Sequence, residues 1–91
     1  MSDPNCPLCT RKLQEANGLP YLHPPDGICW ASYCVSHPGR VIVVLERHSA
    51  TATPEEWARM ESIIRRLRPG CTFKTSLDSA SIPHHFHLHE T

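Results

Sequence analysis

The C-terminal sequence His85-Phe86-His87-Leu88-His89 alternates imidazole and apolar side chains. A β-strand places successive side chains on opposite faces, so the alternation predicts a strand whose histidines share one face. Neighbouring histidines would lie about 6.5–7 Å apart, with Phe86 and Leu88 packed beneath a helix. The alternative is a histidine-rich tail that scavenges metal or remains from a tag, but a tag would consist of consecutive histidines. We interpret the row as functional, because imidazole near neutral pH serves as nucleophile, acid, base or metal ligand.

Three further segments have strand patterns. The strongest is Arg40–Glu46, whose continuous run of β-branched residues indicates burial on both faces. Alternation over Ile28–Val35 and over Cys71–Leu77 predicts two more strands.

Two segments are predicted to be helical. The longer one begins with Thr53 as N-cap and Glu56 as its capping-box partner, and it ends at Pro69-Gly70. Its apolar residues lie on one face, and the arginines opposite are balanced by glutamates, which is typical of a solvated face rather than a nucleic-acid site. One or two helical turns are predicted within Thr10–Ala16. The fold class is therefore α+β, with a largely antiparallel sheet, one long amphipathic helix and a short N-terminal helix.

The composition limits the possible functions. A length of 91 residues fits a single domain over residues 1–91. Nine Lys and Arg balance nine Asp and Glu, which argues against strong nucleic-acid binding. No apolar run predicts a membrane helix, and residues 1–5 lack the features of a secretory signal, so we expect a cytoplasmic protein that does not bind membranes. Seven His and five Cys point to a metal.

The N-terminal Cys6-Pro7-Leu8-Cys9 is a C-x-x-C motif. This spacing allows two thiolates to bind one tetrahedral Zn²⁺, and His48 and His85 are candidates for the other two ligands. The alternative is a redox pair, but a thioredoxin-like motif would follow a strand.

The other cysteines, Cys29, Cys34 and Cys71, fall in predicted strands and are expected to act as small hydrophobes. A second metal site that includes Cys29 or Cys34 is an alternative. His23 and His37 lie beside prolines in predicted loops, and we expect both to be solvated.

The row of histidines resembles the signature of the histidine-triad (HIT) family, in which His alternates with apolar residues. Cys6-Pro7-Leu8-Cys9 is similar to the C-x-x-C of zinc-containing members. The segment from Pro38 to His48 resembles the family's strand that ends in Arg-His before the long helix. The resemblance thus extends from Cys6 to His89.

The resemblance implies an antiparallel sheet with a long helix, a homodimer, and hydrolysis or transfer of a nucleotidyl group from a nucleotide or nucleotide conjugate. By this analogy His87 attacks the α-phosphorus to form a nucleotidyl-histidine, and His89 contacts the phosphate or the leaving group. In zinc-containing members, including the related galactose-phosphate uridylyltransferases, the ligands of a structural zinc ion match Cys6, Cys9, His48 and His85.

Several positions depart from the family pattern. Ser32 stands where the family often has an Asp that binds ribose, and Arg40 replaces the His of a Gly-His pair. In the loop before the triad only Ser79 or Ser81 could contact a phosphate, and Asp78 would repel one. We take Ser81, with His89, as the candidate nucleotide-binding residues.

Three hypotheses follow. The chain is a HIT-type hydrolase or transferase with His87 as nucleophile; a zinc-bound HIT-like module without catalysis; or a redox or metal-handling protein that uses Cys6 and Cys9.

Overall fold

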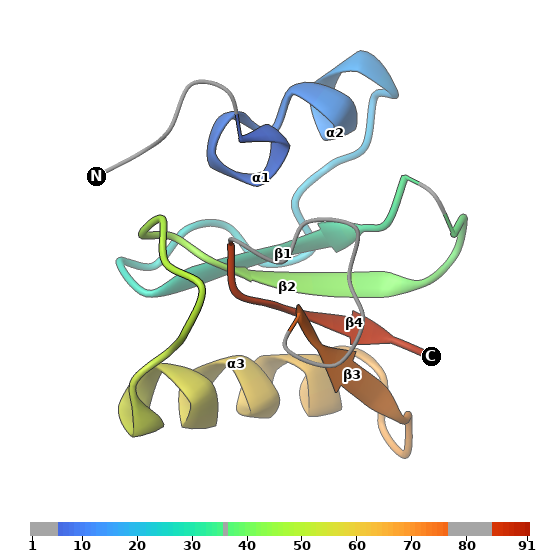
Figure 1. Ribbon diagram of the computed structural model, residues 1–91. Coiled ribbons are helices and arrows are strands. Elements are labelled where there is room, and N and C mark those ends of the chain that lie inside the picture. Colours follow the sequence, from blue (N-terminus) through green and yellow to red (C-terminus); the bar gives the residue numbers. More distant parts are fainter. Residues whose placement is uncertain (1–5, 36, 77–84) are drawn as a thin grey trace.

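The apolar run of the sequence forms an inner strand of a four-stranded antiparallel sheet (Figure 1). The computed structural model describes residues 6–35, 37–76 and 85–91. The sheet has the order β1-β2-β4-β3. In chain order the elements are α1 (Pro7–Thr10), α2 (Lys12–Ala16), β1 (Cys29–Tyr33), β2 (Val41–Leu45), α3 (Pro54–Leu67), β3 (Phe73–Thr75) and β4 (His87–Glu90).

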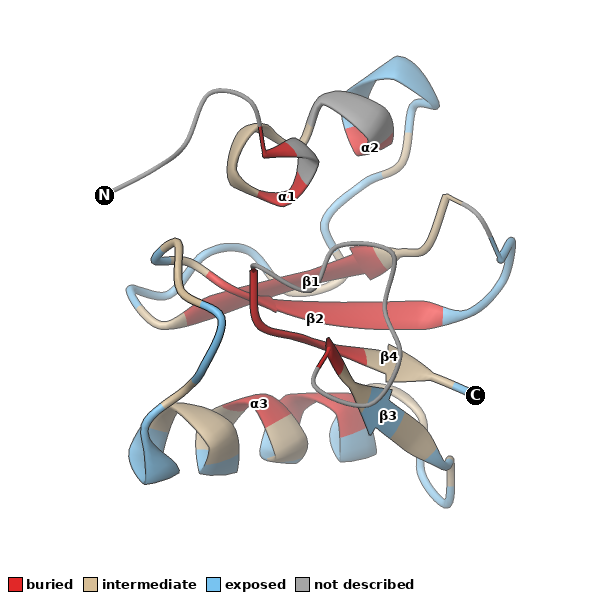
Figure 2. Ribbon diagram, viewed as in Figure 1, coloured by how far each residue is buried: buried red, intermediate tan, exposed pale blue. Residues whose placement is uncertain are grey.

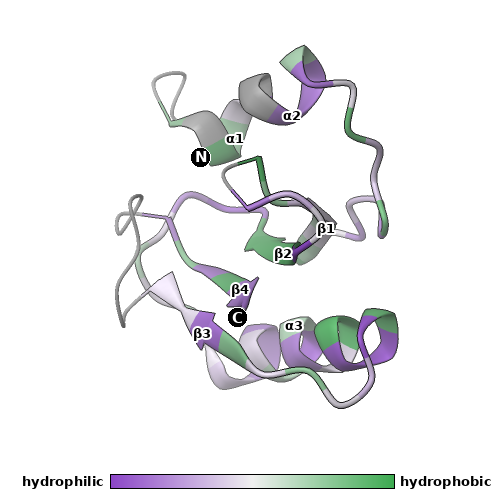
Figure 3. Cartoon of the chain, turned by 90° about the vertical axis from the view of Figure 1, so that its right-hand side faces the viewer, coloured by the Kyte–Doolittle hydropathy of each residue, from purple (hydrophilic) through white to green (hydrophobic). Residues whose placement is uncertain are grey.

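Helices lie on both faces of this sheet. Figure 1 shows α3 along one face and the short helices α1 and α2 above the other. The view turned by 90° in Figure 3 shows the same layers, and α3 carries both hydrophobic and hydrophilic residues along its length. The predicted mixture of one long helix, a small N-terminal helical region and an antiparallel sheet is confirmed.

The strand register decides which face carries the histidines. His87 lies opposite Val44, and His89 lies opposite Ile42, in the antiparallel pairing of β4 with β2. Directly opposed residues point to the same face. Ile42 and Val44 belong to the apolar cluster that contains Cys6, so the histidine row faces the N-terminal helices.

The opposite face of the sheet holds the larger core. Phe86 and Leu88 are fully buried there against α3, as the alternation predicts. The tilted rings of Phe86 and Trp57 have centroids 5.0 Å apart. Every residue of β2 is buried, because alternate side chains enter the two apolar clusters (Figure 2). The predicted burial of this strand on both faces is thus confirmed.

The start of α3 follows the predicted capping box. The Thr53 hydroxyl accepts a hydrogen bond from the Glu56 amide at 3.2 Å, and the Glu56 carboxylate accepts one from the Thr53 amide at 2.8 Å. Two of the amide groups that a helix start leaves without partners are thereby satisfied.

Other predicted boundaries were wrong in detail. The N-terminal helical region divides at Arg11, whose φ of 54° is left-handed. The strands are shorter than predicted, so Cys34 follows β1 and Cys71 precedes β3 instead of lying within them. His85 and Phe86 precede β4, although the alternation of faces continues through them. No helix among the described residues is long and apolar enough to cross a membrane.

Candidate metal centre and histidine row

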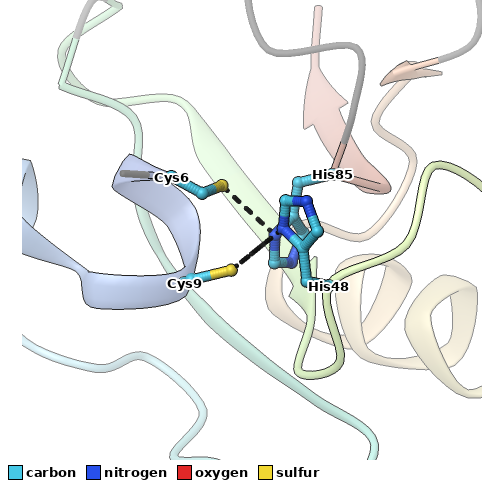
Figure 4. A group of neighbouring side chains, drawn as sticks. All are labelled: Cys6, Cys9, His48 and His85. Carbon is cyan, nitrogen blue, oxygen red and sulfur yellow. Dashed lines mark hydrogen bonds between the residues drawn. The ribbon is translucent and has the colours of Figure 1, made fainter. Parts of the chain in front are cut away.

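The C-x-x-C motif forms the single turn of α1. The amides of Cys9 and Thr10 donate to the Cys6 carbonyl at 3.1 and 3.2 Å, and the Thr10 hydroxyl donates to the same oxygen at 3.2 Å. This turn brings the side chains of Cys6 and Cys9 to one side of the helix, where both point toward two histidine rings (Figure 4).

The four predicted metal ligands meet at this point. The Nδ1 of His85 lies 3.4 Å from the Cys6 sulfur and 3.3 Å from the Cys9 sulfur. The Nδ1 of His48 lies 3.1 Å from the Cys9 sulfur. One donor atom from each of the four residues lies within 4.8 Å of the other three. In a tetrahedral zinc site, bonds of about 2.0–2.3 Å separate the ligand atoms by roughly 3.3–3.8 Å, so the observed spacing is close to that of a loaded site.

A hydrogen bond to the backbone of β2 fixes the orientation of the His85 ring. Its Nε2 lies 2.6 Å from the carbonyl oxygen of Leu45, which can only accept a hydrogen bond. The proton of the neutral ring is therefore on Nε2, and the lone pair is on Nδ1, which faces the sulfurs. His85 and Cys6 are almost completely buried. Cys9 and His48 are half-buried, and the set of two thiols and two imidazoles, with one ring held in the ligating tautomer, could hold a metal ion.

His87 follows the metal cluster on the same face of the sheet. Its Nδ1 donates to the backbone carbonyl of His85 at 2.8 Å, and its amide donates to the Ser76 hydroxyl at 3.1 Å. Because a carbonyl only accepts, the lone pair of the neutral ring is on Nε2. Burial lowers the pKa of His87, and the bond to His85 only partly opposes this effect. The ring is therefore neutral at pH 7.

His89 has different neighbours. Its ring packs edge-on against that of His37, with centroids 5.0 Å apart, and the Cys34 sulfur lies 3.7 Å from the Nδ1 of His37. Partial burial lowers the pKa of His89, and nearby His37 lowers it further. His37 is exposed, as the sequence predicts, but its contact with His89 was not predicted. The local signal for a cluster here was the spacing Cys34-x-x-His37. The third residue, His89, lies far away in the chain.

Other predicted residues have structural roles or lie outside the described part. Ser32 is fully buried, and its hydroxyl donates to the Pro20 carbonyl at 2.8 Å. Arg40 is exposed. His23, expected to be solvated, instead lies 3.1 Å from an oxygen of Asp26. Asp78, Ser79 and Ser81 lie outside the described residues.

The comparisons with known proteins show the fold alone. No protein-family model matches the sequence, and no curated protein matches it. Among solved structures, a hypothetical protein from Leishmania major is similar, with a TM-score of 0.62 and 16% sequence identity. The alignment covers 94% of this chain and 71% of that chain. This likeness supports the arrangement of helices and strands described above.

Proposed function

We propose that the chain hydrolyses or transfers nucleotidyl groups, with His87 as the nucleophile and a zinc ion as a structural element. The observation that carries the proposal is the hydrogen bond from His87 Nδ1 to the His85 carbonyl. It leaves the lone pair of the neutral ring on Nε2, which is the state that a nucleophilic imidazole requires. The resemblance to the histidine-triad family supplies the class of substrate.

The reaction has two displacements. In the first, the lone pair of His87 Nε2 forms a bond to the α-phosphorus, and the bond from phosphorus to the leaving group breaks. The leaving group departs with that electron pair and takes a proton from solvent. In the second, water or another acceptor attacks the phosphorus, the P–N bond breaks, and the acceptor loses a proton. The bond to His85 holds the ring in place and stabilises the positive charge that it carries between the two steps.

Zinc is the ion that best fits the cluster of Cys6, Cys9, His48 and His85. Zinc readily accepts two thiolates and two imidazoles in a closed tetrahedral site, and closed sites of this kind are structural. When bound, the ion would join α1 to the segment before β4. It would therefore fix the position of the His85 carbonyl, which in turn orients His87.

The direct test is turnover of an adenosine phosphoramidate by the wild type, His87→Ala and a control, His23→Ala. We expect His87→Ala to abolish turnover while its zinc content and circular dichroism remain those of the wild type. His23→Ala should keep turnover, because His23 is remote in the fold from the histidine row. Mass spectrometry after a rapid quench in alkaline denaturant, which preserves the P–N bond, should find a nucleotidyl adduct on the peptide that contains His87. Full activity in folded His87→Ala would exclude this mechanism.

A second candidate is a zinc-bound module of the same fold without catalysis. The favouring observation is Ser32, which occupies the position of a ribose-binding Asp but is fully buried and bonded to Pro20. It is therefore not available to a ribose hydroxyl in this conformation. A folded zinc protein that neither binds nor hydrolyses nucleotides would support this candidate.

A further inference from the structure

A second group of metal-ligating side chains lies at the far end of the histidine row. Cys34 directly follows β1, His37 lies in the turn between β1 and β2, and His89 lies on β4. One donor atom from each of the three lies within 4.8 Å of the other two. The Cys34 sulfur and the His37 Nδ1 are 3.7 Å apart, which is close to the roughly 3.5 Å between thiolate and imidazole ligands of one zinc ion.

The backbone holds these side chains together. The Cys34 amide donates to the Arg40 carbonyl at 2.8 Å, and the Arg40 amide donates to the His37 carbonyl at 3.1 Å. Gly39, with φ of 86°, allows the tight reversal between the strands. The pairing of β2 with β4 then places His89 opposite Ile42, which lies two residues after Arg40. Thus the cluster depends on the sheet and not on chance contacts of long side chains.

An independent observation at His89 points to a missing partner. Its Nε2 is buried and has no hydrogen-bond partner among the described residues. Buried ring nitrogens are normally satisfied, and one that is not calls for an explanation. A metal ion coordinated by His37 and Cys34 would lie where such a partner is needed.

We propose that Cys34, His37 and His89 form a second metal site, for zinc or a related divalent ion. One thiolate and two imidazoles suit borderline-soft ions, and three protein ligands leave a fourth position for water. His37 is exposed and Cys34 only half-buried, so the ion would be accessible to solvent. Arg40 contributes positive charge near His89, so this site should bind its ion more weakly than the site of Cys6, Cys9, His48 and His85.

The test uses Co²⁺, because a thiolate bound to Co²⁺ gives a near-ultraviolet charge-transfer band. Zinc-loaded wild type is titrated with Co²⁺ under reducing conditions, and released zinc is measured at each step. We expect one further ion per chain to bind, with the thiolate band and without release of the first zinc. The band should be lost in Cys34→Ser and in His37→Ala, and it should persist in the matched controls Cys71→Ser and His23→Ala.

His37→Ala keeps the test decisive if Cys34→Ser fails to fold, because His37 is exposed on a turn. Binding of no second ion by the wild type would overturn the proposal. So would a second ion whose thiolate band survives in folded His37→Ala, since it would then lie elsewhere.

Discussion

The Nε2–H of His85 donates a 2.6 Å hydrogen bond to the carbonyl oxygen of Leu45, the last residue of β2. The same ring presents its Nδ1 to the sulfurs of Cys6 and Cys9. The N-terminal helix is thereby linked to the sheet through one imidazole, and the Nδ1–H of His87, two residues further on, donates a hydrogen bond to the backbone carbonyl of that residue. A metal ion bound by this cluster would therefore couple metal binding to the orientation of His87.

Removal of the metal should destabilise the α1 side of the sheet more than the α3 side. The apolar cluster on the α1 side is small and includes Cys6 itself, whereas the cluster beneath α3 is larger and contains neither Cys6 nor Cys9. After chelation we expect a lower melting temperature, because metal-binding free energy contributes to folding. Hydrogen exchange should rise first in α1, while the buried residues of α3 stay protected. Equal loss of protection on both faces would contradict this division.

Replacement of Thr53 by Ala should destabilise the protein by about 1 kcal/mol, because it removes the N-cap of α3. Urea unfolding measures the change. Thr51→Ala is the matched control, since Thr51 is exposed and lies before the helix. We expect the control to change the free energy of unfolding by less than about 0.5 kcal/mol. An equal effect of the two substitutions would show that the cap contributes nothing.

The ion pair between Glu56 and Arg47 should increase the free energy of unfolding at neutral pH, and this contribution should be lost in acid. The Arg47 guanidinium donates to both carboxylate oxygens, at 2.7 and 2.8 Å, and lowers the pKa of Glu56 to about 2. In the unfolded chain this pKa is about 4.3. The folded pKa is the lower one, so the contribution is complete above the unfolded value and is lost as pH falls toward 2.

Glu56→Gln isolates this effect, because Gln can still complete the capping box. At pH 7 the variant should be less stable than the wild type in urea unfolding. The difference in the free energy of unfolding between the two proteins should decrease steadily as the pH falls from about 5 to about 2. Metal loss in acid affects both proteins alike, so it does not alter the difference between their free energies of unfolding. A difference in the free energy of unfolding that is constant across this pH range would rule out a role for the charge of Glu56.

Excess zinc should slow the reaction that we propose for His87. His89 is the candidate phosphate contact and also a proposed ligand of the second metal, so it cannot serve both at once. We expect added Zn²⁺ to inhibit turnover in the wild type and in Cys71→Ser, and to have little effect in Cys34→Ser. This prediction applies only if the chain is active. Inhibition of equal strength in the three proteins would place the inhibitory zinc elsewhere.

The sequence predicted the local features of this fold well. A capping box, a β-branched run and a period of two each involve residues close in the chain, and α3, β2 and the faces of Phe86 and Leu88 followed them. The division of the N-terminal helix at Arg11 was missed, because a left-handed residue other than glycine has no clear signal in sequence.

The two metal clusters differ in how far sequence could predict them. The C-x-x-C motif predicted two ligands of the first cluster and left His48 and His85 as candidates for the other two, and the family resemblance then implied the same four residues. The second cluster depends on the register of β2 against β4, which brings His89 to the turn that holds Cys34 and His37. Such long-range pairing is set by the packing of the whole sheet, so the sequence did not bring the three residues together. His37 was expected to be solvated, His89 was interpreted as a phosphate contact, and Cys34 was expected to be a small hydrophobe, with a metal site as the alternative.

The central claim is that one metal ion joins the C-x-x-C to the residue that orients His87. The most direct measurement is the zinc content of protein purified under reducing conditions and dialysed extensively, by plasma mass spectrometry. We expect about one zinc per chain in the wild type, in Cys71→Ser and in Cys34→Ser, and almost none in Cys6→Ser or His85→Ala. A wild type without zinc would exclude the four-ligand site, and Cys6 and Cys9 would then be better interpreted as a redox pair.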